Sequence, residues 1–203
     1  AIVSVTRVFE IIDLPKERKG EGIADETGDR LGDETADGKG KSTAPPAIQF
    51  EAVSFRYGAD EKHVLEHVNF EIPQGSHVAF IGRSGTGKST ILKLIATFLE
   101  PDAGRIKLFG RDYAELSPGQ IRQALAYVSQ DAVLFPLSVE ENVRIGNPGA
   151  SKEQIGEAIR KAGCESFADI TLAERGSNLS GGQRQRLAMA RGIAKAADIY
   201  LFD

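Results

Sequence analysis

The sequence predicts an α/β fold with a mainly parallel sheet and a single core over about residues 47–203. Three observations predict it. An apolar run at 77–81 leads through a glycine-rich loop into a segment with helical spacing at 90–99. Further short apolar runs alternate with helical ones, as in sheets with parallel strands. The last run, at 199–202, ends in a carboxylate, Asp203.

The expected elements follow one another in this order. A β-rich segment at about 47–72 precedes the core strand at 77–81 and the helix at 90–99. We expect strands near 105–108 and 125–128, then helices near 139–144 and 151–163. A helix beginning near residue 180 leads to the strand at 199–202. The helices between the later strands predict an inserted α-helical subdomain at about 131–180.

Residues 82–89 read GRSGTGKS and match the phosphate-binding pattern G-x-x-x-x-G-K-[ST]. Glycines let such a loop wrap around a polyphosphate, and its N–H groups and the next helix N-terminus attract anions. Lys88 can reach the β- and γ-phosphates, and Ser89 can ligate Mg²⁺. A chance glycine-rich turn is disfavoured by the strand before the loop and the helix after it. The predicted nucleotide contacts here are Gly82, Arg83, Ser84, Gly85, Thr86, Gly87, Lys88, Ser89 and Thr90.

A second motif, LSGGQ at 179–183, precedes a helical stretch and the apolar strand that ends in Asp203. With the phosphate loop, it makes the chain from about residue 47 onward resemble the nucleotide-binding domain of ABC transporters. That resemblance implies a P-loop NTPase (RecA-like) core with an antiparallel β-subdomain and an inserted helical subdomain. It implies ATP and Mg²⁺ as cofactors. It also implies a head-to-tail dimer in which one chain's motif closes over the other chain's ATP, through Ser180, Gly181, Gly182 and Gln183.

The resemblance assigns roles to three further residues. Tyr57 would stack on the adenine ring, although a strand-end tyrosine in the β-subdomain is the alternative. Gln130 follows a strand and would touch Mg²⁺ or the attacking water; a solvated loop residue is its alternative. Asp203 would hold Mg²⁺ through water. Lys88, Gln130 and Asp203 are thus the candidate catalytic residues, and Ser89, Gln130 and Asp203 the candidate metal-site residues.

In the family, a general-base Glu usually follows that Asp, and a switch histidine comes later. Here the chain ends at Asp203, and its histidines, His63, His67 and His77, all precede the phosphate loop. We therefore expect an incomplete domain, cut after the Asp of the Walker B strand. We expect an ATPase in the full-length parent and an inactive fragment in isolation.

The exporter type of ABC transporter is indicated by two segments. Residues 1–15 place apolar side chains on one helical face and resemble the connector from a transmembrane domain. Residues 171–176, TLAERG, resemble the x-loop of exporters, with Glu174 as its contact, although 167–171 is shorter than usual. A solvated Glu174 is the alternative. The resemblance implies a transmembrane domain in the same polypeptide and a position on the cytoplasmic face of a membrane, the plasma membrane if bacterial.

Residues 16–46 are dominated by Gly, Asp, Glu, Lys and Thr, which predicts a low-complexity, disordered linker. A regulatory or partner-binding insert remains the alternative. The net charge of −4, with scattered basic residues, gives no indication of nucleic-acid binding. The single Cys164 is expected to be a buried, reduced thiol.

The leading hypothesis is the ATP-hydrolysing domain of an ABC exporter, in which ATP-driven dimer closure is coupled to transport. A soluble ABC-type ATPase acting on DNA or ribosomes is the alternative, but its typical coiled-coil or basic insertions are absent from the sequence. The LSGGQ motif argues against a nucleotide kinase. The transported substrate, the identity of the dimer partner and the residue after Asp203 stay open.

Overall fold

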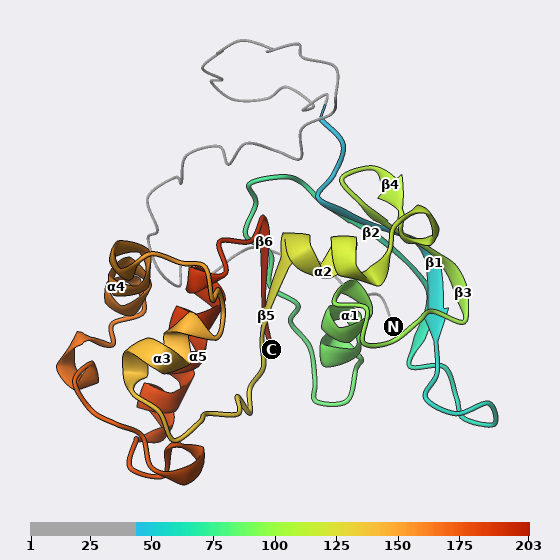
Figure 1. Cartoon of the computed structure of the whole chain (residues 1–203). Helices are drawn as coiled ribbons and strands as arrows, with labels where there is room; N and C mark the ends of the chain where they lie inside the picture. Colours follow the sequence, from blue (N-terminus) through green and yellow to red (C-terminus); the bar gives the residue numbers. More distant parts are fainter. Residues whose placement is uncertain (1–43) are drawn as a thin grey trace, which may run out of the picture.

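The structure is a computed structural model that describes residues 44–203. Two lobes lie on either side of a short parallel strand pair (Figure 1). The predicted connector at 1–15 lies outside the described residues, as do residues 16–43 of the predicted linker. None of the helices in the described part of the chain is both long and apolar enough to cross a bilayer.

One lobe contains a four-stranded antiparallel sheet with strand order β2-β1-β3-β4. Its strands are β1 (Ile48–Phe55), β2 (Leu65–Ile72), β3 (Ala103–Leu108) and β4 (Arg111–Asp112). In the central strand, β1, Ile48 pairs with Ile72 on one side and with Leu108 on the other. The predicted antiparallel β-subdomain and its β-rich first segment are confirmed.

The core of this lobe packs the sheet against helix α1 (Lys88–Ile95), with α2 (Pro118–Ala124) and the short 3₁₀ helix η1 (Tyr113–Glu115) beside it. Ile91, Leu94 and Ile95 of α1 are buried at a spacing of three and four residues, which defines one helical face. Helix α2 was not predicted from the sequence. Its signal was Ser117-Pro-Gly-Gln120, a capping box with proline at the first helical position.

The second lobe is helical. It contains α3 (Val139–Arg144), α4 (Lys152–Lys161) and α5 (Gly181–Ala194), with the 3₁₀ turns η2 (Glu165–Phe167) and η3 (Glu174–Gly176). Each of the three α-helices begins with a serine in a capping box, which satisfies N–H groups that a helix leaves free. The helices predicted near 139–144 and 151–163 are confirmed, and Cys164 is buried among them.

A buried polar joint ties α5 to α3 in this lobe. Asn142, fully buried in α3, accepts at its Oδ1 from the Phe135 N–H (3.1 Å) and from Arg191 Nη2 of α5 (2.9 Å). The same guanidinium donates from Nη1 to the Val133 carbonyl at 2.7 Å. Because both partners are satisfied, this joint fixes the segment before α3 against α5 without leaving a buried polar group unpaired.

Strands β5 (Leu125–Val128) and β6 (Ile199–Phe202) form the parallel pair between the lobes, at the positions predicted for them (Figure 1). The strand predicted at 77–81 is wrong. These residues form no strand, and Ile81 is 60% exposed. A strand needs a neighbour that completes its backbone hydrogen bonds, and no strand in residues 44–203 pairs with this run. The described strands are therefore mainly antiparallel, contrary to the expected parallel sheet.

Candidate nucleotide site

The glycine-rich loop leads directly into α1, with Gly87 at the helix N-cap. Gly85 and Gly87 have φ angles of 80° and 90°, in the left-handed region that favours glycine. A Cβ on Gly87 would lie 2.8 Å from Leu65 Cδ2, whereas one on Gly85 would meet nothing within 4 Å. Gly87 is therefore required by packing and by backbone conformation, while open space lies above Gly85, where a ligand can approach the backbone.

The Lys88 ammonium lies within the curve of this loop. Its Nζ donates to the carbonyl oxygens of Gly82 (3.0 Å) and Arg83 (2.6 Å). Thr86 Oγ1 donates to the same Arg83 carbonyl at 2.9 Å. The loop carbonyls thus hold a positive charge at its mouth, where a polyphosphate would need a compact cationic donor.

Ser89 and Asp203 are 114 residues apart in sequence and meet in the structure, where Ser89 Oγ donates to Asp203 Oδ1 at 2.6 Å. The Asp203 N–H continues the parallel ladder by donating to the Val128 carbonyl at 3.0 Å. A hydroxyl beside a carboxylate supplies the hard oxygen donors that Mg²⁺ prefers. The residues present therefore fit the predicted magnesium site, in which Ser89 would ligate the ion and Asp203 would hold it through water.

The Tyr127 side chain also contacts the Asp203 carboxylate, and this contact was not predicted from the sequence. Its hydroxyl donates to Asp203 Oδ2 at 2.7 Å. Burial raises the pKa of Tyr127 above its usual value, and the hydrogen bond and negative charge of Asp203 raise that pKa further. The hydroxyl therefore keeps its proton and acts as a hydrogen-bond donor to the carboxylate.

Tyr57 lies two residues beyond β1 and is 54% exposed. Its hydroxyl is 3.1 Å from Thr90 Oγ1 in the first turn of α1, so the structure brings it beside the phosphate loop. Its ring contacts Phe55 edge-on at 5.0 Å. An exposed ring next to the loop can receive a flat base by stacking, so the predicted adenine contact stays a prediction that this position favours.

Gln130 follows β5 and is exposed. Among residues 44–203, no hydrogen bond joins its side chain to Ser89 or Asp203. The structure therefore does not bring Gln130 into the Ser89–Asp203 pair, and its role at the metal stays a prediction.

The LSGGQ motif forms the N-terminus of α5. Ser180 Oγ accepts from the Gln183 N–H at 3.2 Å, and Gln183 Oε1 accepts from the Ser180 N–H at 2.8 Å. Gly181 and Gly182 are exposed, and a Cβ on either would approach only an arginine side chain, at 3.9 and 3.8 Å. Within the described residues, no hydrogen bond joins this motif to the phosphate loop, because α5 lies in the other lobe (Figure 1).

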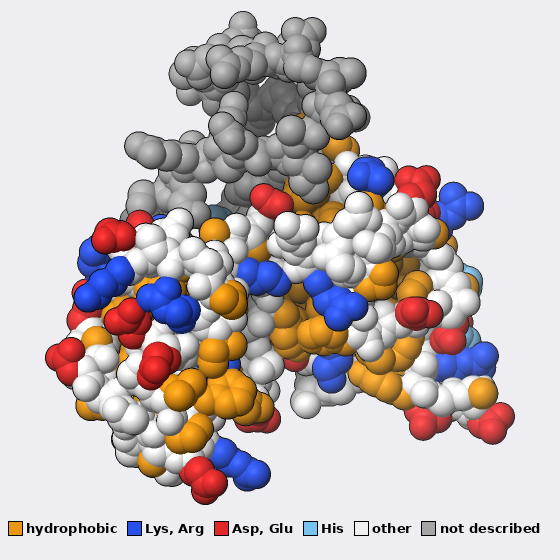
Figure 2. All heavy atoms as spheres, in the orientation of Figure 1, with side chains coloured by type: hydrophobic (Ala, Val, Ile, Leu, Met, Phe, Trp, Pro, Cys, Tyr) orange, Lys and Arg blue, Asp and Glu red, His pale blue; other side chains and the backbone are white. Residues whose placement is uncertain are grey.

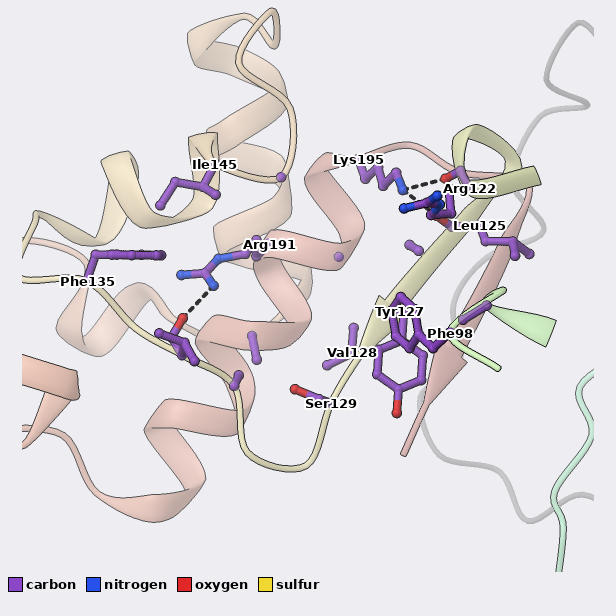
Figure 3. A pocket seen from close by; sticks show the side chains of 17 residues that line it. Phe98, Arg122, Leu125, Tyr127, Val128, Ser129, Phe135, Ile145, Arg191 and Lys195 are labelled. Atoms are coloured by element: carbon purple, nitrogen blue, oxygen red, sulfur yellow. Dashed lines mark hydrogen bonds between the residues drawn. The ribbon is translucent and has the colours of Figure 1, made fainter. Parts of the chain in front are cut away.

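A groove of about 520 Å³ separates the two lobes. Hydrophobic side chains lie on both sides of this hollow (Figure 2). Figure 3 shows Phe98 and Tyr127 on one side, with Phe135 and Ile145 on the other and Arg191 between them. Phe98 and Phe135 are 54% and 42% exposed, so much of this apolar surface has no partner within residues 44–203.

Comparison with known families identifies the fold. The model of the ABC transporter family matches residues 65–203, which include the phosphate loop, LSGGQ and Asp203. The chain belongs to the ABC transporter family. This membership confirms the predicted family and its ATPase fold, and it gives no support to the DNA or ribosome alternative.

The proteins similar to this chain include a flippase, a multidrug transporter and an exporter. The chain is 40% identical over 163 residues to an ATP-dependent lipid A-core flippase of Chromohalobacter salexigens, covering 77% of this chain and 28% of the flippase. It is 38% identical over 210 residues to the ABC multidrug transporter mdr2 of Aspergillus fumigatus, covering 98% and 24%. The structure of a bacterial Atm1-family ABC exporter with ATP bound matches with 38% identity and a TM-score of 0.73, covering 79% of this chain and 30% of that one. The chain thus spans about a quarter of the length of these curated relatives.

Proposed function

We propose that this chain is the ATP-binding part of an ABC exporter, in which binding and hydrolysis of ATP drive transport across a membrane. The observation that carries the proposal is the pairing of Ser89 with Asp203 beside the Lys88 loop. The similarity of the chain to a lipid A-core flippase and to an Atm1-family ABC exporter supports it. The loop and Lys88 bind the phosphates, Ser89 and Asp203 hold Mg²⁺, and Tyr57 receives the base. A Mg²⁺ ion held there would supply positive charge against the phosphates.

The LSGGQ residues act on a second nucleotide-binding domain, identical or different. Gly181 and Gly182 are exposed in a helix, where glycine costs roughly 1 kcal/mol relative to alanine. Within residues 44–203, nothing near either glycine requires its small size. The phosphate of a nucleotide bound to another chain would require this small size when it approaches the N-terminus of α5. The Lys88 loop belongs to the other lobe, which supports one composite site across two chains.

The groove between the lobes takes part of a transmembrane domain. Exposed Phe98, Val133 and Phe135 line it, and an apolar surface of this kind needs a partner in the assembled protein. The conformational change of dimer closure is then transmitted to the transmembrane domain through this groove and through the exposed turn at Glu174. In this arrangement the chain lies on the cytoplasmic face of the membrane.

Mixed variants of the 203-residue chain test the composite site. Lys88→Ala inactivates the phosphate loop and Gly182→Asp inactivates the LSGGQ motif. A dimer of either variant alone therefore has no intact composite site. A mixed dimer keeps one site with both motifs intact. We expect Mg·ATP-dependent association in sedimentation experiments for the wild type, none for either variant, and partial recovery in the mixture. Association that survives Gly182→Asp, or a mixture no better than its components, would contradict the proposal.

A further inference from the structure

Both oxygens of the Asp203 carboxylate accept a hydrogen bond from a side chain. Ser89 of α1 donates to Oδ1 at 2.6 Å, and Tyr127 of β5 donates to Oδ2 at 2.7 Å. The magnesium chemistry of the loop accounts for Ser89. That chemistry does not involve Tyr127, so the hydrogen bond from Tyr127 to Asp203 requires its own explanation.

The register of the parallel strands brings Tyr127 to this carboxylate. Tyr127 pairs with Leu201, and Asp203 lies two residues further along, on the same face because side chains alternate along a strand. The bond from the Asp203 N–H to the Val128 carbonyl, at 3.0 Å, extends the pairing to the end of the chain. Backbone pairing, and not a freely moving side chain, therefore sets the separation of hydroxyl and carboxylate.

The Tyr127 ring is itself held by Phe98. The two rings meet edge-on, with centroids 5.1 Å apart and an interplanar angle of 76°. Phe98 follows the C-terminal turn of α1, and its N–H donates to the Lys93 carbonyl at 2.9 Å. Two routes thus connect α1 to Asp203. Ser89, at the start of the helix, contacts the carboxylate directly, and Phe98, just beyond the helix, contacts it through the ring of Tyr127.

We propose that Tyr127 is a positioning residue that orients the Asp203 carboxylate for Mg²⁺. The terminal torsion of an aspartate is broad, so a single hydrogen bond leaves the carboxylate plane free to turn. Donors on both oxygens fix that plane and leave the remaining lone pairs for water on the metal. The inference rests on the proposed function, since it concerns the same magnesium site.

The connection extends to the groove. Phe98 and Tyr127 both line it, so a group that enters the groove contacts the same rings that hold the carboxylate (Figure 3). Removing the Phe98 ring should therefore make the Tyr127 side chain more mobile and weaken Mg²⁺ binding. The effect should be smaller than that of removing the Tyr127 hydroxyl.

The test measures what Mg²⁺ adds to nucleotide binding. The 203-residue chain is titrated with methylanthraniloyl-ATP, once in EDTA and once in excess Mg²⁺, and the ratio of the two Kd values is the magnesium increment. Tyr127→Phe and Phe98→Ala are compared with two matched controls. Tyr113→Phe removes a hydroxyl that donates to the Ile95 carbonyl at 2.8 Å, away from the metal site. Val133→Ala shortens another exposed side chain of the groove.

We expect Tyr127→Phe to reduce the magnesium increment by roughly tenfold or more, the scale of one hydrogen bond to a charged group. Phe98→Ala should reduce it less, and neither control should change it. Binding in EDTA should be the same in all five proteins. An unchanged or larger increment in Tyr127→Phe, or an equal loss in Tyr113→Phe, overturns this inference alone. A wild-type chain that binds no nucleotide in either buffer overturns the proposed function as well.

Discussion

Thr97 carries a β-branched side chain at a φ of 58°, in the left-handed region that glycine usually occupies at the end of a helix. Its N–H donates to the Leu94 carbonyl at 3.1 Å, and the next N–H, of Phe98, donates to the Lys93 carbonyl. These two bonds form a Schellman turn that terminates α1. The Thr97 hydroxyl is buried and has no hydrogen-bond partner among residues 44–203. This residue is therefore strained where it directs Phe98 toward Tyr127.

Thr97→Gly should relieve the backbone strain and raise the free energy of unfolding by about 1 kcal/mol. For a chain of this size the melting temperature should rise by about 3 °C, measured by circular dichroism. Thr97→Ala is the matched control, because it removes the unpaired hydroxyl but keeps a Cβ at positive φ. Glycine should stabilise more than alanine, and a glycine variant that melts below the wild type would show that the turn is not strained.

Among the elements, α3 depends on a charged capping box. Glu141 accepts from the Ser138 N–H at 2.9 Å and from Ser138 Oγ at 2.6 Å. These hydrogen bonds lower the pKa of Glu141 below its usual 4.5. A carboxylate with a lowered folded pKa stabilises fully above its unfolded pKa and loses that contribution as pH falls through the folded value.

Glu141→Gln keeps an acceptor for the box but removes the charge at the helix N-terminus. The wild type should therefore melt above the variant at pH 7, and the difference should shrink as the pH falls below about 4.5. Melting curves of both proteins from pH 7 to pH 3 measure this difference. A gap that stays constant over that range would mean that the Glu141 charge does not stabilise α3.

The wrong strand prediction at 77–81 and the confirmed helices differ for a physical reason. A helix satisfies its backbone within one segment, so apolar spacing alone was enough to predict α3 and α4. A strand is completed by a neighbour that the segment does not contain. The apolar run at 77–81 resembles β5 in sequence but has no ladder partner among the described residues. The missed helix α2 could have been found from its capping box.

At the scale of the whole molecule, the phosphate loop and LSGGQ could be read from sequence because each lies within one short segment. The pairing of Ser89 with Asp203 was expected only from the family resemblance, since it joins residues 114 positions apart. Tyr127 could not be predicted, because its contact with Asp203 depends on the register of β5 against β6. The groove was missed for the same reason, since two lobes form it.

Every candidate site residue lies between Tyr57 and Asp203, so residues 16–43 should not be needed for nucleotide binding. Replacing them with a short Gly/Ser linker should leave the ATP affinity within tenfold, or roughly 1.4 kcal/mol. Titration of both proteins with Mg·ATP measures this. A greater loss would assign the segment a structural or regulatory role in the site.

The central claim is that the loop around Lys88 binds the phosphates of Mg·ATP, and calorimetric titration of the 203-residue chain tests it most directly. Lys88→Ala removes the ammonium held by the Gly82 and Arg83 carbonyls, while Lys93→Ala removes a lysine from the same helix away from the loop. We predict saturable binding of Mg·ATP by the wild type and by Lys93→Ala. Lys88→Ala should lose at least tenfold in affinity, because the ATP phosphates lose their cationic partner. No binding by the wild type, or equal affinity in Lys88→Ala, would contradict the account.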